Sequence, residues 1–280
     1  DFCLSRGLGD VYKRQPLNRG NSASLFMGWE EQLSFVRDAL GPKLKETGLK
    51  TKIYAFDHNY NYDNMLEQQG YPMKIYEDEN AASFLTGAAY HNYGGDREEL
   101  NNVNGKFPDK ELIFTETSIG MWNDGRNLEK RLMEDMEETA LGTVNNWCKA
   151  VIVWNLMLDN ERGPNREGGC QTCYGAVDID RSDYKTITRN SHYYIIGHLS
   201  SVVKPGAVRI GSKGYTADGI MYSAFENLDG TEALVLLNNT DGTKNITVNS
   251  GERSFTYEVP AKAVASFRWN LYLSLIHISE

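Results

Sequence analysis

Polar and aromatic side chains follow several short apolar segments of this sequence. They are Asp57, His58, His91, Tyr93, Glu116, Trp154, Asn155 and Asp159. Carboxyl groups can attack or protonate a glycosidic bond, and the flat faces of Trp and Tyr can pack against a sugar ring. The set contains no cysteine nucleophile, and the sequence has no HExxH, GxSxG, GxGxxG or Walker motif. These residue types favour chemistry on a sugar.

A metal site is a weaker interpretation of the same residues. An anionic metal site would gather several Asp, Glu and His side chains within two strands, and His58 and His91 are too few. We therefore expect no metal and no cofactor. A metal-dependent hydrolase of another barrel class is kept as a competing hypothesis, which stoichiometric bound zinc would favour.

The segments that must position these side chains are four predicted strands, at 52–57, 85–93, 112–116 and 150–155. Each is short, apolar on both faces and polar at its end, as buried parallel strands are. They recur at roughly the 30-residue length of a βα unit, so we expect four successive units of one parallel sheet. Four such strands make half of a (β/α)₈ barrel, whose chemistry lies at the C-terminal strand ends.

Helical spacing of apolar residues predicts helices at 25–40, 128–147 and 192–203, with a break or kink at Gly41-Pro42. After Pro205 the pattern changes to short strands divided by turn residues. These predicted strands are 220–225, 233–237, 245–248, 254–259 and 264–269. We expect a small antiparallel β-sandwich there.

The two ends of the chain resemble translated adapter sequence, and we set aside 1–15 and 271–280 as foreign. The alternative for 1–15 is a genuine surface arm. The expected organisation is therefore 16–204 as the C-terminal half of an α/β barrel, strands 5–8, and 205–270 as the β-sandwich. We expect the natural protein to continue upstream of Pro16.

Charge and cysteines restrict the possible partners only in part. The net charge of −9 disfavours nucleic acid and anionic membranes, and no apolar stretch reaches the length of a transmembrane helix. Cys170 and Cys173 have the spacing of half a zinc knuckle without a second half. We expect them to be structural, as a loop disulfide or as two buried thiols.

Several segments together resemble glycoside hydrolase family 30, whose members include the lysosomal glucosylceramidases. IFTETSIG at 113–120 is similar to the nucleophile strand of that family, and AYHNY at 89–93 to the strand before it. WNLMLD at 154–159 with GPN at 163–165 resembles the final strand and its loop, and LVLLN at 234–238 the side β-sandwich. Each segment is weak alone, but their order along the chain makes the set specific.

The resemblance implies a retaining β-glycosidase that works by double displacement. In it Glu116 is the nucleophile, oriented by neighbours such as Tyr93. Trp154 would pack against the sugar, and His91 and Asn155 would hydrogen-bond near it. The implied substrate is a β-linked glucan, a glucoside or a glycolipid, and we expect a secreted or periplasmic protein.

Each assignment has a structural alternative. Asp57 is expected to fix loop geometry rather than to touch the sugar. Glu116 could be a solvated strand end, Tyr93 and Trp154 could fill the core, and His91 could be a buried histidine with its hydrogen bonds satisfied. A non-catalytic carbohydrate-binding fragment is the corresponding alternative for the whole chain.

The acid/base residue implied by the resemblance is missing. The family carries it as Glu in an Asn-Glu-Pro sequence, and Pro16 matches that proline, but Gln15 precedes it. A glutamine side chain cannot transfer the proton that the leaving group needs. We therefore expect this chain by itself to be nearly inactive.

Overall fold

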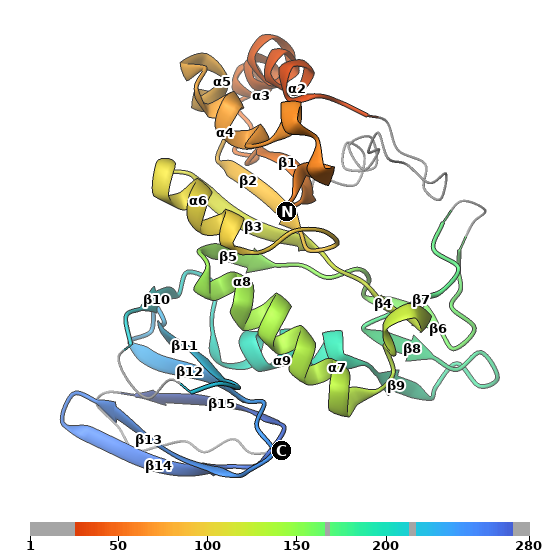
Figure 1. Ribbon diagram of the computed structural model, residues 1–280, viewed down its shortest axis with the longest axis vertical. Helices are drawn as coiled ribbons and strands as arrows, with labels where there is room; N and C mark the ends of the chain where they lie inside the picture. The colour runs from red at the N-terminus through yellow and green to blue at the C-terminus, as the bar shows by residue number, and fades with distance from the viewer. Residues whose placement is uncertain (1–25, 166–168, 213–216, 271–280) are drawn as a thin grey trace.

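The computed structural model describes residues 26–165, 169–212 and 217–270 (Figure 1). A parallel sheet with flanking helices forms the N-terminal part, and antiparallel sheets form the C-terminal part. A long helix, α9 (Ser191–Val202), leads from the first part to the second.

The parallel sheet contains four strands in the order β1-β2-β3-β5. They are β1 (Tyr54–Asn59), β2 (Gly87–His91), β3 (Glu111–Glu116) and β5 (Cys148–Val151). Every neighbouring pair is parallel, so the predicted succession of parallel strands is confirmed. All five residues of β2 are buried, as expected of a strand covered on both faces.

Helices connect these strands and cover the sheet. They are α2 (Trp29–Phe35), α3 (Gly41–Thr47), α4 (Tyr71–Tyr76), α5 (Glu79–Phe84) and α6 (Glu98–Lys106), with short 3₁₀ turns at Tyr62–Asn64 and Leu66–Gln68. Tyr90, Phe114, Ile75 and Leu100 are fully buried where strands and helices meet. The short helices α4 and α5 were not predicted, because each is only six residues long and shows little periodicity.

The predicted break or kink at Gly41-Pro42 does not end the helical region, since the chain is helical from Trp29 to Thr47. A π-helical turn at Val36–Leu40 separates α2 from α3, and the Gly41 amide donates to the Val36 carbonyl five residues earlier. Pro42 has no N–H to donate, so the helical run lacks a backbone hydrogen bond at the point where the π-helical turn ends.

A second helical layer joins the sheet to the C-terminal part. The predicted helix at 128–147 is α7 (Leu128–Asp135), a π-helical turn at Met136–Ala140, and α8 (Leu141–Asn145). Met136 of this segment and Ile195 of α9 share one buried cluster with Val235 and Leu237 of the following sheet. The two parts of the chain therefore have a common core.

The C-terminal part is antiparallel throughout. One sheet has the order β10-β11-β12-β15, from β10 (Val208–Ile210), β11 (Ile220–Glu226), β12 (Thr231–Asn238) and β15 (Ala263–Asn270). A hairpin of β13 (Lys244–Ser250) and β14 (Arg253–Val259) packs on it through Phe255, whose ring lies 5.2 Å from that of Phe267. The five predicted strands are all present, and β10 is an additional one.

Two small sheets lie beside the C-terminal ends of the parallel strands. β4 (Ile119–Gly120) pairs with β7 (Cys173–Tyr174), and β6 (Met157–Asp159) lies in a sheet with β8 (Val177–Ile179) and β9 (Ile187–Arg189). None was predicted, because strands of two or three residues have no readable alternation.

The predicted strand at 150–155 is only partly correct. β5 starts earlier, at Cys148, and ends at Val151. Beyond it the Ile152 amide still donates to Phe114, but Trp154 forms a single bridge with Ser118 outside the sheet. An apolar run in the sequence cannot show where hydrogen bonding between two strands ends, because the end of the pairing depends on the partner strand.

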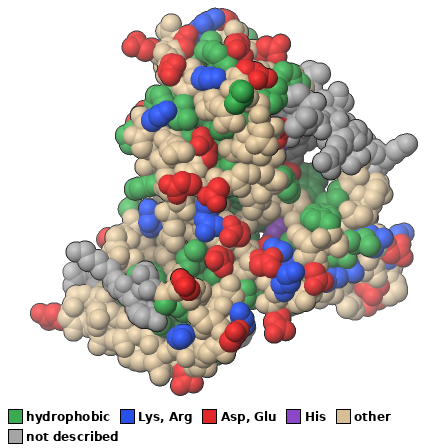
Figure 2. All heavy atoms as spheres, in the orientation of Figure 1, with side chains coloured by type: hydrophobic (Ala, Val, Ile, Leu, Met, Phe, Trp, Pro, Cys, Tyr) green, Lys and Arg blue, Asp and Glu red, His purple; other side chains and the backbone are tan. Residues whose placement is uncertain are grey.

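The outer surface carries both signs of charge, and acidic and basic side chains are interspersed on the face seen in Figure 2. Among the described residues, none of the helices has the length and hydropathy needed to span a membrane.

The N-terminal ends of the strands are tied by an ion-pair cluster around Glu111. Lys52 and Lys149 lie 2.8 and 3.3 Å from its carboxylate, and the Tyr54 hydroxyl donates to it at 2.6 Å. Partial burial raises the pKa of Glu111, but the hydrogen bonds from Lys52, Tyr54 and Lys149 outweigh burial and lower it to about 2. One carboxylate thus links β3 to residues of β1, β5 and the segment before β1.

We expect Glu111→Gln to lower the free energy of unfolding by about 1–3 kcal/mol at pH 7. Because the folded pKa is depressed, this stabilisation is present above the unfolded pKa and is lost as the pH falls from about 4.5 towards 2. Urea unfolding of both proteins at pH 7, 4.5 and 2.5 measures the difference. Glu46→Gln, at an exposed ion pair with Lys43, serves as the control and should change little. If the difference in unfolding free energy between wild type and Glu111→Gln were the same at all three pH values, the lowered pKa of Glu111 would be contradicted.

Candidate active site

Glu116 lies at the C-terminal end of β3, where it meets Tyr93 from the loop after β2. The Tyr93 hydroxyl donates to Oε1 of Glu116 at 3.2 Å and lies 2.5 Å from Oγ of Ser118. Parallel pairing causes this meeting, because His91 is the register partner of Glu116 and Tyr93 follows two residues later. A carboxylate with a neutral hydroxyl donor at its side is held in one direction for attack.

Tyr93 remains a hydrogen-bond donor over a wide pH range. Desolvation first, and the negative charge of Glu116 second, raise the pKa of Tyr93 well above its usual value. Tyr93 is 48% exposed, and its hydroxyl makes two short contacts, with Glu116 and Ser118. A protonated phenol can stabilise an ionised Glu116 without neutralising it.

Behind this pair, Asp57 connects the ends of three strands. Its Oδ1 lies 3.0 Å from Nε2 of His91 and accepts a hydrogen bond from the Thr115 hydroxyl at 2.6 Å. Phe56 and Asp57 have φ angles of 77° and 66°, at a bulge in the pairing of β1 with β2. Left-handed backbone is strained in residues other than glycine, and such strain is often found at functional sites. The bulge turns the Asp57 carboxylate towards its two neighbours.

His91 is buried, being only 2% exposed, and its partner Asp57 is partly buried. His58 lies next to it, with ring centroids 5.9 Å apart, and Nε2 of His58 is 3.1 Å from the Asp63 carboxylate. This geometry gives His91 an interior, supporting position, and its predicted contact with a sugar stays a prediction. Despite the two His–Asp pairs, the described residues contain no group of three or more His, Cys, Asp or Glu that could hold a metal ion.

Trp154 and Asn155 lie beside the segment that follows β3. The Trp154 amide donates to the Thr117 carbonyl at 2.8 Å, which fixes Trp154 directly beside the strand that carries Glu116. The Trp154 side chain is 40% exposed, as a side chain that meets a ligand must be. Oδ1 of Asn155 is buried and has no hydrogen-bond partner among the described residues.

A cleft of about 470 Å³ opens at these two residues. Its walls are formed by Trp154, Asn155, Leu158, Pro164, Asn165, Gly169, Cys170 and Cys173. The size and the mixture of one aromatic ring, amide side chains and apolar groups suit a sugar unit or two.

A disulfide between Cys170 and Cys173 cross-links the loop that forms one wall of this cleft. The sequence left open whether these cysteines form a disulfide or two thiols, and the structure has the disulfide. Cys148 is a buried free thiol. Thr172, inside the cross-linked loop, accepts a hydrogen bond from the Met121 amide at 3.0 Å, so the loop is also attached to the segment after Glu116.

The structure thus brings Glu116 and Tyr93 together, holds Asp57 and His91 behind them, and lines the adjacent cleft with Trp154 and Asn155. Sequence reasoning missed Thr115 and Ser118, whose hydroxyls contact Asp57 and Tyr93. Their positions in the sequence, directly before Glu116 and two residues after it, were the available signal. Gln15 and Pro16, which carry the predicted acid/base position, lie outside the described residues.

Two family profiles match the chain. Residues 16–203 match the glycosyl hydrolase family 30 TIM-barrel domain, and residues 206–267 match the glycosyl hydrolase family 30 beta sandwich domain. The α/β part is therefore of TIM-barrel type and the C-terminal part of the sandwich type.

Curated relatives and solved structures point the same way. The chain is 29% identical over 269 residues to endo-1,6-beta-D-glucanase BGN16.3 of Trichoderma harzianum, covering 91% of the chain and 50% of that protein. It is 31% identical to putative glucosylceramidase 2 of Caenorhabditis elegans, over 75% of the chain and 40% of that protein. The structure of the endo-beta1,6-glucanase BT3312 is similar with a TM-score of 0.89 and 72% identity, over 92% of this chain and 57% of that one. The chain thus spans about half the length of the curated relatives it matches.

We expect Asp57→Gly to be more stable than Asp57→Ala by about 1 kcal/mol, the reverse of the usual order in a strand. Both variants lose the hydrogen bonds from His91 and Thr115, which costs about 1–3 kcal/mol, but only glycine accepts the φ of 66° without strain. Urea unfolding midpoints measure the order. Asp57→Asn keeps an acceptor oxygen and should lie closest to the wild type. An alanine variant as stable as the glycine variant would contradict the left-handed assignment.

Proposed function

Because the chain belongs to glycosyl hydrolase family 30, we propose that it forms part of a retaining β-glycosidase in which Glu116 is the nucleophile. The observation that carries the proposal is the contact between Tyr93 and Glu116 at the ends of two neighbouring parallel strands. Catalytic groups of barrel enzymes lie at such strand ends.

In this mechanism a carboxylate oxygen of Glu116 attacks the anomeric carbon while the bond to the leaving oxygen breaks. A second carboxyl group protonates the leaving oxygen and then deprotonates the water that releases the sugar. Tyr93 orients the Glu116 carboxylate through its hydrogen bond. Trp154 packs against the sugar, and the Asn155 side chain forms hydrogen bonds close to it. Asp57 and His91 support the floor of the site, and a direct contact of His91 with the sugar would need the ring to become accessible.

The proposed substrate is a β-1,6-linked glucan. This choice is supported by the printed activities of the relatives, since endo-1,6-beta-glucanases are similar over most of the chain. Glucosylceramide is the second candidate, because putative glucosylceramidases are similar as well. The cleft lined by Trp154 and Asn155 would hold the part of the substrate next to the scissile bond in either case.

We further propose that the four parallel strands are strands 5–8 of the barrel and that the chain by itself is nearly inactive. The sheet order and the length relative to the curated relatives support this. General acid catalysis contributes about 10²–10⁴-fold, and Gln15 at the matching position could not supply it. The corresponding alternative is a carbohydrate-binding segment without catalysis. The domain limits at 16–204 and 205–270, and the foreign origin of 1–15 and 271–280, are part of the same proposal.

A location outside the cytoplasm, secreted or periplasmic, is proposed for the same protein. A polymeric glucan does not enter cells unaided, and the Cys170–Cys173 disulfide is of a kind that persists in oxidising compartments.

The test of the function is a chimera that joins the N-terminal part of the endo-beta1,6-glucanase BT3312 to residues 16–270 of this chain. We expect it to hydrolyse β-1,6-glucan, and Glu116→Gln in the chimera to lower kcat by at least about 10³-fold. A 2-deoxy-2-fluoroglucosyl fluoride should label Glu116, as identified by peptide mass spectrometry.

The unjoined chain and the chimera should be assayed side by side on β-1,6-glucan, glucosylceramide and an aryl β-glucoside. Normal turnover by the unjoined chain would overturn the proposed inactivity. A well-folded chimera that binds glucan but neither turns over nor becomes labelled would favour the non-catalytic alternative.

We expect Tyr93→Phe in the same chimera to lower kcat about 10–100-fold with little change in KM, because Glu116 loses the donor that fixes its direction. Since the pKa of Tyr93 is raised, its hydroxyl stays protonated, and the loss should be equal at pH 5 and pH 9. Tyr184→Phe, at an exposed tyrosine away from the site, is the matched control. A deficit that shrinks between these pH values would indicate that the hydroxyl titrates in this range.

A further inference from the structure

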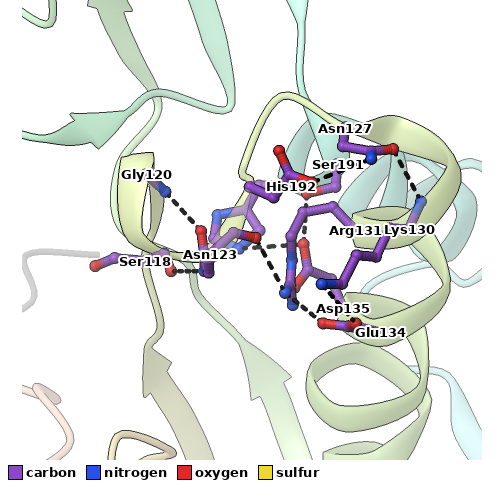
Figure 3. Close-up of polar contacts among 11 residues, drawn as sticks. Ser118, Gly120, Asn123, Asn127, Lys130, Arg131, Glu134, Asp135, Ser191 and His192 are labelled. Carbon is purple, nitrogen blue, oxygen red and sulfur yellow. Dashed lines mark hydrogen bonds and ion pairs between the residues drawn. The ribbon is translucent and has the colours of Figure 1, made fainter.

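An ion pair between Arg131 and Asp135 is buried beneath the active-site loops. Both residues belong to α7, and their side chains are 12% and 6% exposed. Nη2 and Nε of Arg131 donate to Oδ1 of Asp135 at 2.7 and 3.2 Å, as a two-pronged contact of a guanidinium with one carboxylate oxygen. Figure 3 shows this pair between the loop after β3 and the start of α9.

The other oxygen of Asp135 faces α9. Oδ2 accepts a hydrogen bond from the Ser191 hydroxyl and lies 3.8 Å from Nε2 of His192. His192 is fully buried. Asp135 is therefore a junction at which α7 and the first turn of α9 meet through polar contacts, in addition to the apolar packing of Met133 and Ile195.

One arm of this network reaches the loop that follows Glu116. Nη1 of Arg131 approaches the Asn123 carbonyl at 3.5 Å, and the Asn123 side chain accepts from the Gly120 amide at 2.9 Å and donates to the Ser118 carbonyl at 3.2 Å. Ser118 is the residue whose hydroxyl contacts Tyr93. The guanidinium thus lies behind the segment that carries the neighbours of Glu116.

The second arm reaches the residues that line the cleft. The backbone amide of Asn190, the residue before α9, donates to the Ala176 carbonyl at 2.9 Å, and the Ala176 amide donates to the Asn155 carbonyl at 2.8 Å. The start of α9 is therefore attached through Ala176 to Asn155, the chain neighbour of Trp154.

The free energy of folding alone does not explain why Arg131 and Asp135 form a buried ion pair. Burying two charges costs desolvation energy that their attraction often only balances, and apolar residues of similar volume can replace such a pair without loss of stability. An apolar pair, however, offers no directed contacts to Asn123 and Ser191. Directed contacts are what positions a loop to within a fraction of an ångström.

We propose that Arg131 and Asp135 are positioning residues, which hold the nucleophile loop and Trp154 in register with each other from the helical side of the barrel. The catalytic consequence rests on the proposed function, whereas the effect on the backbone does not. Neither residue touches the reacting atoms in this assignment, and both act through Asn123 and through the first turn of α9.

The first experiment uses the full chain and needs no activity. In Arg131→Met/Asp135→Leu we expect an unchanged Tm, and at least about tenfold faster hydrogen exchange at the amides of Gly120, Met121 and Trp154. Those three amides are hydrogen-bonded to Asn123, Thr172 and Thr117. Amides of β11 and β12, which pair with each other far from the loops, are the internal reference.

A second variant keeps the experiment decisive if the double variant does not fold. Arg131→Lys retains the charge next to Asp135, but one ammonium group cannot also reach the Asn123 carbonyl, so faster exchange is expected at Gly120 and not at Trp154. Glu134→Gln removes the more exposed partner of the same guanidinium and is the matched control. Exchange within about twofold of wild type at all three amides, in folded protein, would overturn the proposal.

In the active chimera, the double variant should lower kcat on β-1,6-glucan about 10–100-fold while KM changes less than about threefold, and Glu134→Gln should leave both unchanged. Unchanged kcat in a variant with faster exchange would overturn the catalytic consequence. An unsubstituted chimera without activity would instead reject the proposed function, and the exchange result would still decide on the positioning.

Discussion

The parallel pairing of β2 with β3 is the constraint on which the candidate site depends. The strands approach so closely at Gly87 that a Cβ there would lie 1.8 Å from the Glu111 carbonyl oxygen. Glycine at this position allows the ladder to run from the N-terminal end to the pair His91 and Glu116. Because both strands end together, the residues that follow them converge. The Tyr93 hydroxyl therefore contacts Glu116 directly.

The two ends of the same sheet use charge in different ways. At the N-terminal end, Glu111 is surrounded by two lysines and a tyrosine, so its charge is compensated and its pKa falls. At the C-terminal end, Glu116 accepts a hydrogen bond from the neutral hydroxyl of Tyr93. The Asp57 carboxylate there is hydrogen-bonded to His91 and Thr115. The Tyr93 hydroxyl orients Glu116, whereas two lysines and a tyrosine make Glu111 a link between strands.

The C-terminal sheets also bear on the site, through the helices between them. Ile195 and Met136 pack against Val235 and Leu237, so α9 and the segment after α7 are held by the sandwich core. The same two helical segments carry Asp135 and Ser191, which are hydrogen-bonded to each other next to this apolar cluster.

The sequence by itself determined the order of the elements, the parallel succession of the strands and the five main strands of the sandwich. It also singled out the candidate site residues Glu116, Tyr93, Trp154, Asn155, His91 and Asp57. These follow from local spacing and from the residues that end each apolar run. The end of β5 at Val151, the bulge at Asp57, the disulfide, the contact of Ser118 with Tyr93 and the junction at Asp135 were decided by the tertiary structure. The disulfide depends on how the loop between its two cysteines folds. The others join residues far apart in the chain or depend on the register of a partner strand, and a periodic pattern along one segment contains no information about its partner.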